Sequence, residues 1–339
     1  MPYVFNFPLV TQMTDPQQAV LDETGPVAIS GGPGTGKSVV SLWRHIRNHD
    51  LGIRDSLLIT YAKTLTVYLR SCATPVNENA GNAVKRSLPY LSSLRPRRYD
   101  EIIIDEAQDI NHANYEILRR LADMVSYGAD DQQILYPNEA TTEAELATMF
   151  PANVPHPLDE NFRNTYEIML FTQAAFPNRR ISAVMMQLLR TERSSGIKPI
   201  CMLANSQVKK DNALLEIIAE FQGEAHNIGI LVPRRRDVSN VYNFLQQNRI
   251  ACSCYFHNGR EIDEIENIHV TTFKSAKGIE FDTVILPDFD LWRQNIRRHY
   301  VVEENDYFVA FTRARRNLFL ISNTDQLWVN ASTFDIKRL

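Results

Sequence analysis

The residues best suited to chemistry in this chain form one octapeptide. It reads Gly31, Gly32, Pro33, Gly34, Thr35, Gly36, Lys37 and Ser38, and its spacing fits a phosphate-binding P-loop. An apolar run at 27–29 precedes it and a helical pattern follows it, which is the strand–loop–helix context that the motif requires. Glycines let backbone N–H groups turn toward phosphates, and the helix N-terminus adds a positive dipole. We therefore expect Lys37 to reach the β- and γ-phosphates of a nucleotide and Ser38 to bind Mg²⁺.

A pair of carboxylates supplies a second candidate group. Asp105 and Glu106 directly follow the apolar run 102–104. Side chains at the carboxyl end of a buried parallel strand reach the crevice where ligands bind in α/β sheets. Asp105 could hold Mg²⁺ directly or through water, and Glu106 could orient and deprotonate an attacking water. Taken alone, these two acids could also be a strand end exposed to solvent. Together with the P-loop, they favour a single nucleotide site.

The composition is that of a globular protein. A chain of 339 residues with 44% hydrophobic and 22% charged residues suggests about two domains. No run approaches the roughly 18 apolar residues of a membrane span, and the first ten residues lack the features of a secretion signal. The four cysteines, at 72, 201, 252 and 254, lack paired metal-ligand spacing and favour a reducing cytoplasm. Because the net charge is −4, a nucleic-acid partner would need a local basic track.

Alternating strands and helices must position these residues. Apolar runs predict strands at 27–30, 57–60, 102–105, 200–203, 228–232, 268–272, 283–286 and 318–322, and helical patterns lie at 208–221, 237–248 and 303–314. This alternation predicts an α/β fold with parallel sheets covered on both faces. Prolines at 151, 155 and 157 predict a linker. We therefore expect an N-terminal domain over 1–157 and a C-terminal domain over 158–339.

Two such domains with one P-loop suggest a nucleotide clamped between them. Arg163 and Arg313 each lie near a predicted helix in the second domain, and residues 277–281 form a charged turn between strands. Taken singly, such an arginine is more typical of a surface or salt-bridge position. Spacing alone does not decide between these readings.

Taken together and in chain order, these segments resemble the UvrD/Rep/PcrA-type DNA helicases of superfamily 1. The matching segments are 13–17 with the glutamine motif, 31–38 with the P-loop, 60–63 with a single-strand contact segment, 105–109 with the DExQD box, 128–132 with G-D-x-x-Q, 161–163 with N-Y-R, 272–281 with T-x-H-x-x-K-G-L-E-F and 309–314 with V-A-x-T-R-A. The set runs from Gln17 to about Leu318 and so covers nearly the whole chain.

The resemblance implies two RecA-like domains with P-loop NTPase topology, and ATP and Mg²⁺ as cofactors. Gln17 would read the adenine edge and Phe162 would stack on its face. Glu280 would approach the ribose or the bound strand, and Gln132 would sense the γ-phosphate or position water. Arg163 and Arg313 would neutralise charge on the transferring phosphoryl group, as such arginines do in other phosphoryl-transfer enzymes.

Some positions depart from the family pattern. Ala129 stands where the family has aspartate, Pro137 stands at the position of a base-stacking aromatic with Tyr136 beside it, Val39 replaces a basic residue and Lys274 replaces a histidine. The stretches 69–99 and 254–266 leave no room for the family's two helical insertions, so we expect a minimal core. The basic clusters 95–98 and 234–236, with Tyr61, are candidate nucleic-acid contacts, although such clusters are usually solvated faces.

The resemblance implies an ATP-dependent motor that moves 3′ to 5′ on single-stranded DNA. It also implies a larger assembly, with a nuclease as one possible partner, and no membrane contact. Two alternatives stay open: an RNA-directed ATPase, and a nucleotide-dependent switch that recruits a partner without translocation. The partner's identity, unwinding by the isolated chain and the oligomeric state are also open at this point.

Overall fold

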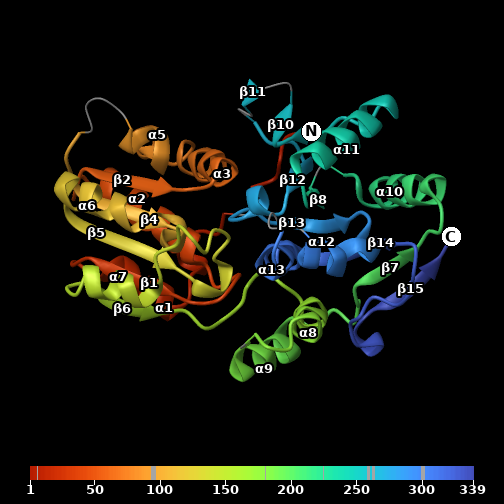
Figure 1. The fold of residues 1–339 in the computed structure, drawn as a ribbon. Helices are drawn as coiled ribbons and strands as arrows, with labels where there is room; N and C mark the ends of the chain where they lie inside the picture. Colours follow the sequence, from red (N-terminus) through yellow and green to blue (C-terminus); the bar gives the residue numbers. More distant parts are fainter. Residues whose placement is uncertain are drawn as a thin grey trace. The chain divides into compact units, whose positions relative to one another are not determined.

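The computed structural model describes the chain except for residues 6, 93–96, 180, 224, 258–259, 262–263 and 299–301. The chain divides into two compact units, shown in Figure 1. We call Phe5–Phe162 the P-loop unit, and Arg163–Leu339 together with Met1–Val4 the C-terminal unit. The chain therefore passes from one unit to the other after Phe162, a few residues beyond the predicted boundary at 157.

The sheet of the P-loop unit has the strand order β3-β2-β4-β5-β1-β6, and every pairing in it is parallel. Its strands are β1 Val27–Ser30, β2 Ser56–Thr60, β3 Val84–Arg86, β4 Tyr99–Asp105, β5 Ala122–Ala129 and β6 Val154–Pro157. Three consecutive β4 residues, Ile102, Ile103 and Ile104, are buried. Because successive side chains point to opposite faces, both faces of this strand are covered.

The helices of this unit connect the parallel strands. They are α1 Asp15–Asp22, α2 Lys37–Asp50, α3 Lys63–Ala73, α4 Glu78–Asn82, α5 Ser87–Leu91, α6 His112–Leu121 and α7 Glu143–Met149. On one face, Tyr115 and Leu118 of α6 pack against apolar side chains of β2, β4 and β5. Parallel strands end at the same edge of the sheet, so the residues after β1, β4 and β5 are brought to one edge.

The predicted linker around residues 151–157 is wrong. Val154–Pro157 form β6, which pairs in parallel with β1 from Val27↔Val154 to Ser30↔Pro157. Proline is tolerated there because β6 is an edge strand, where one side needs no ladder donor. The proline-rich segment therefore completes the sheet beside the P-loop strand.

The C-terminal unit is built on a second parallel sheet with the order β15-β7-β14-β13-β8-β12-β9. Its strands are β7 Ile200–Leu203, β8 Ile228–Val232, β9 Ser253–Cys254, β12 Ile268–Thr272, β13 Phe281–Leu286, β14 Ala314–Ser322 and β15 Asp335–Arg338, with β10 Phe256–His257 and β11 Arg260–Glu261 as a separate hairpin. The helices are α8 Tyr166–Ala175, α9 Ala183–Glu192, α10 Gln207–Phe221, α11 Arg235–Gln247, α12 Trp292–Arg298 and α13 Glu304–Phe311. The α/β prediction with parallel sheets is confirmed in both units.

Short elements occupy the two places where the family's helical insertions would lie. Between α3 and β4 the described residues form α4 and α5, of five residues each, and β3. Between β9 and β12 lies the β10–β11 hairpin, so the expected direct passage from Cys254 to Glu266 is wrong in detail.

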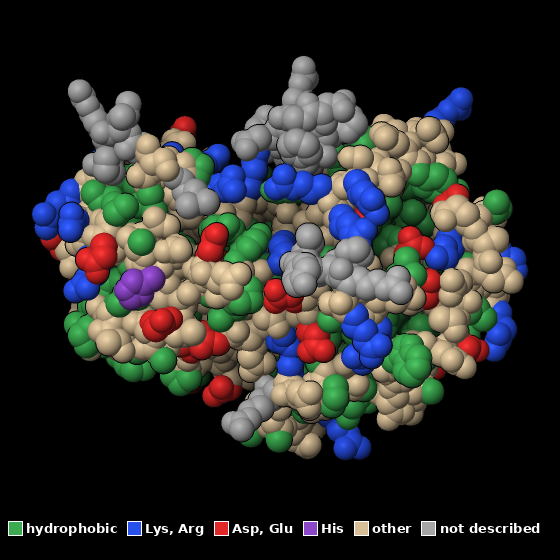
Figure 2. Space-filling model, viewed as in Figure 1, with side chains coloured by type: hydrophobic (Ala, Val, Ile, Leu, Met, Phe, Trp, Pro, Cys, Tyr) green, Lys and Arg blue, Asp and Glu red, His purple; other side chains and the backbone are tan. Residues whose placement is uncertain are grey.

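On the face shown in Figure 2, acidic, basic and apolar side chains are interspersed, in keeping with the net charge of −4. None of the described helices combines the length and apolar character needed to cross a bilayer.

Candidate active site

The P-loop connects β1 to α2 through glycines that the backbone requires. Gly31 has φ 144°, and a Cβ there would lie 2.3 Å from the carbonyl oxygen of Leu158. Gly36 has φ 89° as the N-cap of α2, and a Cβ there would lie 2.5 Å from Nε2 of Gln17. Few side chains tolerate these conformations. The N–H groups of the first turn of α2 have no intrahelical acceptor by helix geometry, which suits an anion.

Lys37 lies inside this loop. Its Nζ donates to the carbonyl oxygens of Gly31 at 2.5 Å and Gly32 at 3.0 Å, and it lies 3.8 Å from a carboxylate oxygen of Asp130. Only 7% of Lys37 is exposed. A buried ammonium surrounded by carbonyl oxygens has a strong tendency to pair with an anion, so phosphate oxygens would be favourable partners.

The acidic pair lies at the carboxyl end of β4, as predicted. A Cβ added to Gly128, on β5, would lie 3.5 Å from Ser41 Oγ, 3.6 Å from Asp105 Oδ1 and 3.7 Å from Lys37 Cβ. The ends of β4 and β5 and the first turns of α2 therefore converge around Gly128. Asp105 is 1% exposed, so its carboxylate is buried in this region of the P-loop unit.

The oxygen donors of this region suit Mg²⁺ when it accompanies a nucleotide. Mg²⁺ prefers oxygen ligands and is usually held by one or two carboxylates plus substrate phosphates. Asp105 and the hydroxyl of Ser38, which is half-buried on the first turn of α2, supply that chemistry. Among the described residues no cluster of three or more His, Cys, Asp or Glu side chains could hold a metal alone.

Glu106 has an unusual backbone conformation. Its φ of 56° and ψ of 49° are left-handed, which non-glycine residues rarely adopt and which often marks a functional position. Its carboxylate accepts a 2.7 Å hydrogen bond from Nε2 of Gln108, whose own Oε1 accepts from the backbone N–H of Asp130 at 3.2 Å. A glutamine therefore connects the carboxylate to the segment after β5.

The segment after β5 places two adjacent glutamines beside Asp130, the acid that lies 3.8 Å from Lys37. Asp130 accepts from the Gln132 backbone N–H at 3.0 Å and from Nε2 of Gln133 at 2.6 Å. Gln133 is 2% exposed, whereas Gln132 is half-buried. Gln132 stays the predicted residue, at the G-D-x-x-Q spacing from Gly128. Counting from Asp130, the acid that faces Lys37, would have indicated Gln133.

The two residues predicted to bind adenine both contact the P-loop. Gln17, on α1, donates to the carbonyl oxygen of Thr35 at 3.1 Å and accepts from the Thr14 backbone N–H at 3.1 Å. The backbone N–H of Phe162 donates to the carbonyl oxygen of Gly34 at 2.9 Å. The P-loop unit thus holds both of them against the same loop.

The remaining predicted residues meet within the C-terminal unit. Arg163 Nε donates to Glu280 Oε2 at 2.8 Å, and Arg315 Nε lies 3.4 Å from Glu280 Oε1. Burial opposes the charge of Glu280, but Arg163 and Arg315 outweigh it and lower the pKa of this carboxyl. Arg313 is 1% exposed and donates to the carbonyl oxygens of Val309, at 3.1 Å, and Ile279, at 3.5 Å. Both candidate arginines therefore contact the turn before β13.

The candidate nucleic-acid contacts have different surroundings. Tyr61 lies against Tyr136, with ring centroids 5.2 Å apart, so an aromatic pair is present in the P-loop unit beside the expected stacking position. Arg235 lies over the ring of Tyr255 at 5.9 Å, and Arg236 lies 3.5 Å from Asp237.

The other basic cluster, 95–98, is described only in part. Residues 95 and 96 lie outside the described residues. Arg97 and Arg98 form ion pairs with Asp55 and Asp123, and such exposed pairs contribute little to stability.

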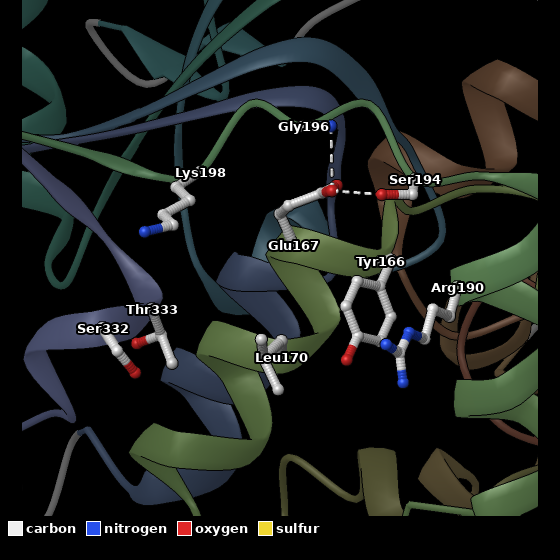
Figure 3. A pocket seen from close by; sticks show the side chains of 9 residues that line it. All are labelled: Tyr166, Glu167, Leu170, Arg190, Ser194, Gly196, Lys198, Ser332 and Thr333. Carbon is white, nitrogen blue, oxygen red and sulfur yellow. Dashed lines mark hydrogen bonds between the residues drawn. The ribbon is translucent and has the colours of Figure 1, made fainter.

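The C-terminal unit also contains a pocket that involves none of the predicted residues. It is a cavity of about 360 Å³. Figure 3 shows its lining side chains, which come from α8, α9, the loop before β7 and the segment before β15: Tyr166, Glu167, Leu170, Arg190, Ser194, Gly196, Lys198, Ser332 and Thr333. Burial opposes the charge of Glu167, but bonds from Ser194, Ser195 and Gly196 lower the pKa of its carboxyl. These bonds give Glu167 a structural role.

Known protein families match both units. The family model described as Schlafen group 3, DNA/RNA helicase domain, matches residues 26–210, more than half of the chain. The chain belongs to this family. The UvrD-like helicase C-terminal domain matches residues 256–325. The resemblance to superfamily 1 helicases is therefore confirmed, because both matching family models describe helicase domains.

Individual relatives are more distant. A putative ATP-dependent DNA helicase, R568, from Acanthamoeba polyphaga mimivirus is 26% identical over 246 residues, covering 65% of this chain and 34% of that protein. The chain thus spans about a third of the length of this curated relative.

Solved structures resemble the chain only loosely. The C-terminal domain of a possible DNA helicase from Lactobacillus matches with a TM-score of 0.39 and 18% identity, over 52% of this chain and 98% of that domain. The Arterivirus nonstructural protein 10 helicase matches with 0.44 and 13% identity, over 96% of this chain and 66% of that one.

Proposed function

We propose that this chain is an ATP-driven motor that moves along single-stranded DNA in the 3′ to 5′ direction. Lys37 and the amides after Gly36 would bind the ATP phosphates, and Gln17 and Phe162 would hold the base. Ser38 and Asp105 would hold Mg²⁺, which neutralises phosphate charge when bound. Glu106 would accept a proton from the attacking water, with Gln132 or Gln133 placed to position that water.

The observation that carries this proposal is the junction of the two units at Phe162 and Arg163. Phe162 is the last residue of the P-loop unit and bonds the P-loop at Gly34, whereas Arg163 is the first residue of this part of the C-terminal unit and pairs with Glu280. Two adjacent residues thus connect the nucleotide loop to the arginine cluster. A change of the P-loop on nucleotide binding would therefore act on the chain segment that joins the units.

Electrostatics supports a transition-state role for Arg163 and Arg313. Phosphoryl transfer depends mainly on positioning and charge stabilisation, and arginines supplied to the transferring group accelerate it by about 10³–10⁵-fold. A hydrolytic cycle would use these residues when ATP is present and release them when it is gone. We infer that this cycle produces stepping along a strand, and that a partner protein, with a nuclease as one candidate, completes the assembly.

The competing substrate is RNA, since the family description names both DNA and RNA helicases. The test measures ATP hydrolysis by the purified chain alone, with a single-stranded DNA and with an RNA of the same sequence. Greater stimulation by DNA supports the proposal. Greater stimulation by RNA would assign the RNA-directed alternative, and a slow rate indifferent to both would favour the nucleotide switch.

A further inference from the structure

The first residues of the chain belong to the C-terminal unit, although the residues that follow belong to the P-loop unit. Tyr3 is 3% exposed. Its backbone N–H donates to the carbonyl oxygen of Ile265 at 2.9 Å, its hydroxyl donates to the carbonyl oxygen of Glu280, and its ring meets Phe281 edge-on at 6.0 Å. Tyr3 is therefore anchored on the turn that carries Glu280.

A second anchor lies next to Tyr3. Asn227 accepts from the Val4 backbone N–H at 2.9 Å and donates to the Val4 carbonyl oxygen at 2.7 Å. Asn227 is buried, and its own backbone N–H donates to Asp282 at 3.0 Å. Asp282 in turn lies 3.7 Å from Arg315, the arginine that also contacts Glu280. Tyr3 and Val4 are thus both connected to the charged cluster formed by Glu280, Asp282 and Arg315.

The next residues pack on the P-loop unit. Phe5 lies against Tyr68, on α3, with ring centroids 5.5 Å apart. Phe7 stacks on Trp43 at 5.0 Å, and the Trp43 indole donates to the carbonyl oxygen of Pro8 at 2.8 Å. Trp43 is on α2, the helix that begins at Lys37. We call residues 1–5 and 7–8 the N-terminal strap, because its two ends are fixed in different units.

We propose that the N-terminal strap positions Glu280 for the reaction, with the Tyr3 hydroxyl holding the Glu280 backbone so that the Glu280 carboxylate and Arg163 keep a defined arrangement. This inference rests on the proposed function. The strap is a second covalent connection between the units, besides the one at Phe162 and Arg163. It joins the P-loop helix to the turn that meets both candidate arginines. Tyr3 is thus a positioning residue, which acts through Glu280.

The chemistry of Tyr3 suits such a role. Burial, more than the nearby charge of Glu280, raises the pKa of Tyr3 well above its usual value. The hydroxyl therefore stays protonated and remains a donor over the whole range in which enzymes are assayed. Its acceptor is a backbone carbonyl, which does not titrate, so the contact does not depend on pH.

The test is Tyr3→Phe, which keeps the ring against Phe281 and removes only the donor. We expect the DNA-stimulated kcat to fall about 3- to 10-fold, as for one lost hydrogen bond, with a smaller change in KM for ATP. In a Glu280→Gln background the same substitution should have little further effect, because residues that act through one group are not additive. Tyr242→Phe, on α11, is the matched control for losing a tyrosine hydroxyl.

Hydrogen exchange supplies a readout that does not need turnover. In Tyr3→Phe, amides of the turn 277–281 should exchange faster, while those of β8 stay as in the parent chain. If Tyr3→Phe kept the kcat of the parent chain and the exchange rates of this turn were unchanged, the positioning role of the N-terminal strap would be wrong. If the parent chain had no ATPase activity, the proposed function would be wrong. Hydrogen exchange would still test whether Tyr3 holds the turn 277–281.

Discussion

Glu106 combines a strained backbone with a chemical position. A left-handed non-glycine residue costs about 1–2 kcal/mol, and the bond from Gln108 helps to fix its side chain there. Glu106→Gln should keep ATP binding and lower kcat by about 10²–10⁴-fold, the usual contribution of a general base. Lys37→Ala should lose both binding and turnover, because it removes the cation of the loop. Equilibrium ATP binding and steady-state hydrolysis measure the two effects. If Glu106→Gln hydrolysed ATP at the rate of the parent chain, Glu106 would not be the general base.

The two neighbouring glutamines after β5 should differ. Nε2 of the buried Gln133 donates to the Asp130 carboxylate, which lies 3.8 Å from Lys37 Nζ, and the backbone N–H of the half-buried Gln132 donates to the same carboxylate. Gln133→Ala should therefore lower kcat about 10-fold or more, as the loss of a positioned polar group does. Gln132→Ala removes a half-buried side chain, so its kcat should fall less. A larger loss of kcat in Gln132→Ala than in Gln133→Ala would favour Gln132, the residue predicted from the sequence.

At the residue scale, motif spacing predicted the positions that local backbone geometry requires. The P-loop glycines and the acids after β4 lie in contiguous segments, so their placement follows from one strand, one turn and one helix. The contact of Gln133 with Asp130 was not predicted, because a count along the sequence does not show which of two adjacent amide side chains is buried. The pairing of Arg163 with Glu280 joins residues 117 apart, and no local pattern encodes it.

Among the elements, apolar runs predicted the strands whose two faces are both buried. All five β8 residues are buried, and the predicted range 228–232 is the observed one. The strands β5 and β6 were not predicted, because Asp123, Ser126 and Gly128 interrupt the apolar pattern of β5 and prolines interrupt β6. Such strands are stabilised by their neighbours in the sheet, and that tertiary context is not visible in a short window of sequence.

Packing of α2 against β2 and α4 makes stability sensitive to acid. His45 is buried, with Nδ1 2.8 Å from Ser56 Oγ and Nε2 3.0 Å from the Ala80 carbonyl oxygen, and burial lowers its pKa to about 3. The unfolded chain protonates this histidine below about pH 6.5, whereas the fold keeps it neutral. Stability should therefore fall as the pH drops from about 6.5 toward 3.

The slope tests this effect. One such histidine contributes about 1.4 kcal/mol per pH unit within that window, and His269, whose pKa burial also lowers to about 3, adds to it. Urea unfolding at pH 7.5 and 5.5 should show a smaller pH dependence in His45→Gln than in the parent chain. His112→Gln, at an exposed position on α6, is the control. Equal slopes in all three chains would contradict the assignment.

For the whole molecule, the sequence indicated two units but not how the chain is shared between them. The place of Met1–Val4 in the C-terminal unit was not predicted, because four residues carry no periodic pattern. Their place in the C-terminal unit depends on Ile265, Asn227 and Glu280, all more than 200 positions away.

The missing helical insertions carry a prediction about unwinding. In their places the described residues form only short elements and no large helical subdomain. We expect the isolated chain to hydrolyse ATP but to separate little or no duplex. Strand displacement on a 3′-tailed DNA duplex at low and moderate salt measures this. Efficient ATP-dependent displacement over tens of base pairs would disprove the need for a partner.

The measurement that tests the central claim most directly compares the parent chain with Arg313→Ala and Arg163→Ala in a DNA-stimulated ATPase assay, alongside equilibrium ATP binding. The account predicts that single-stranded DNA stimulates the parent chain, and that each variant binds ATP nearly as tightly but loses about 10³-fold or more in kcat. Hydrolysis at the parent rate in both variants would contradict the account, because the C-terminal unit would then contribute nothing to the reaction that drives the motor.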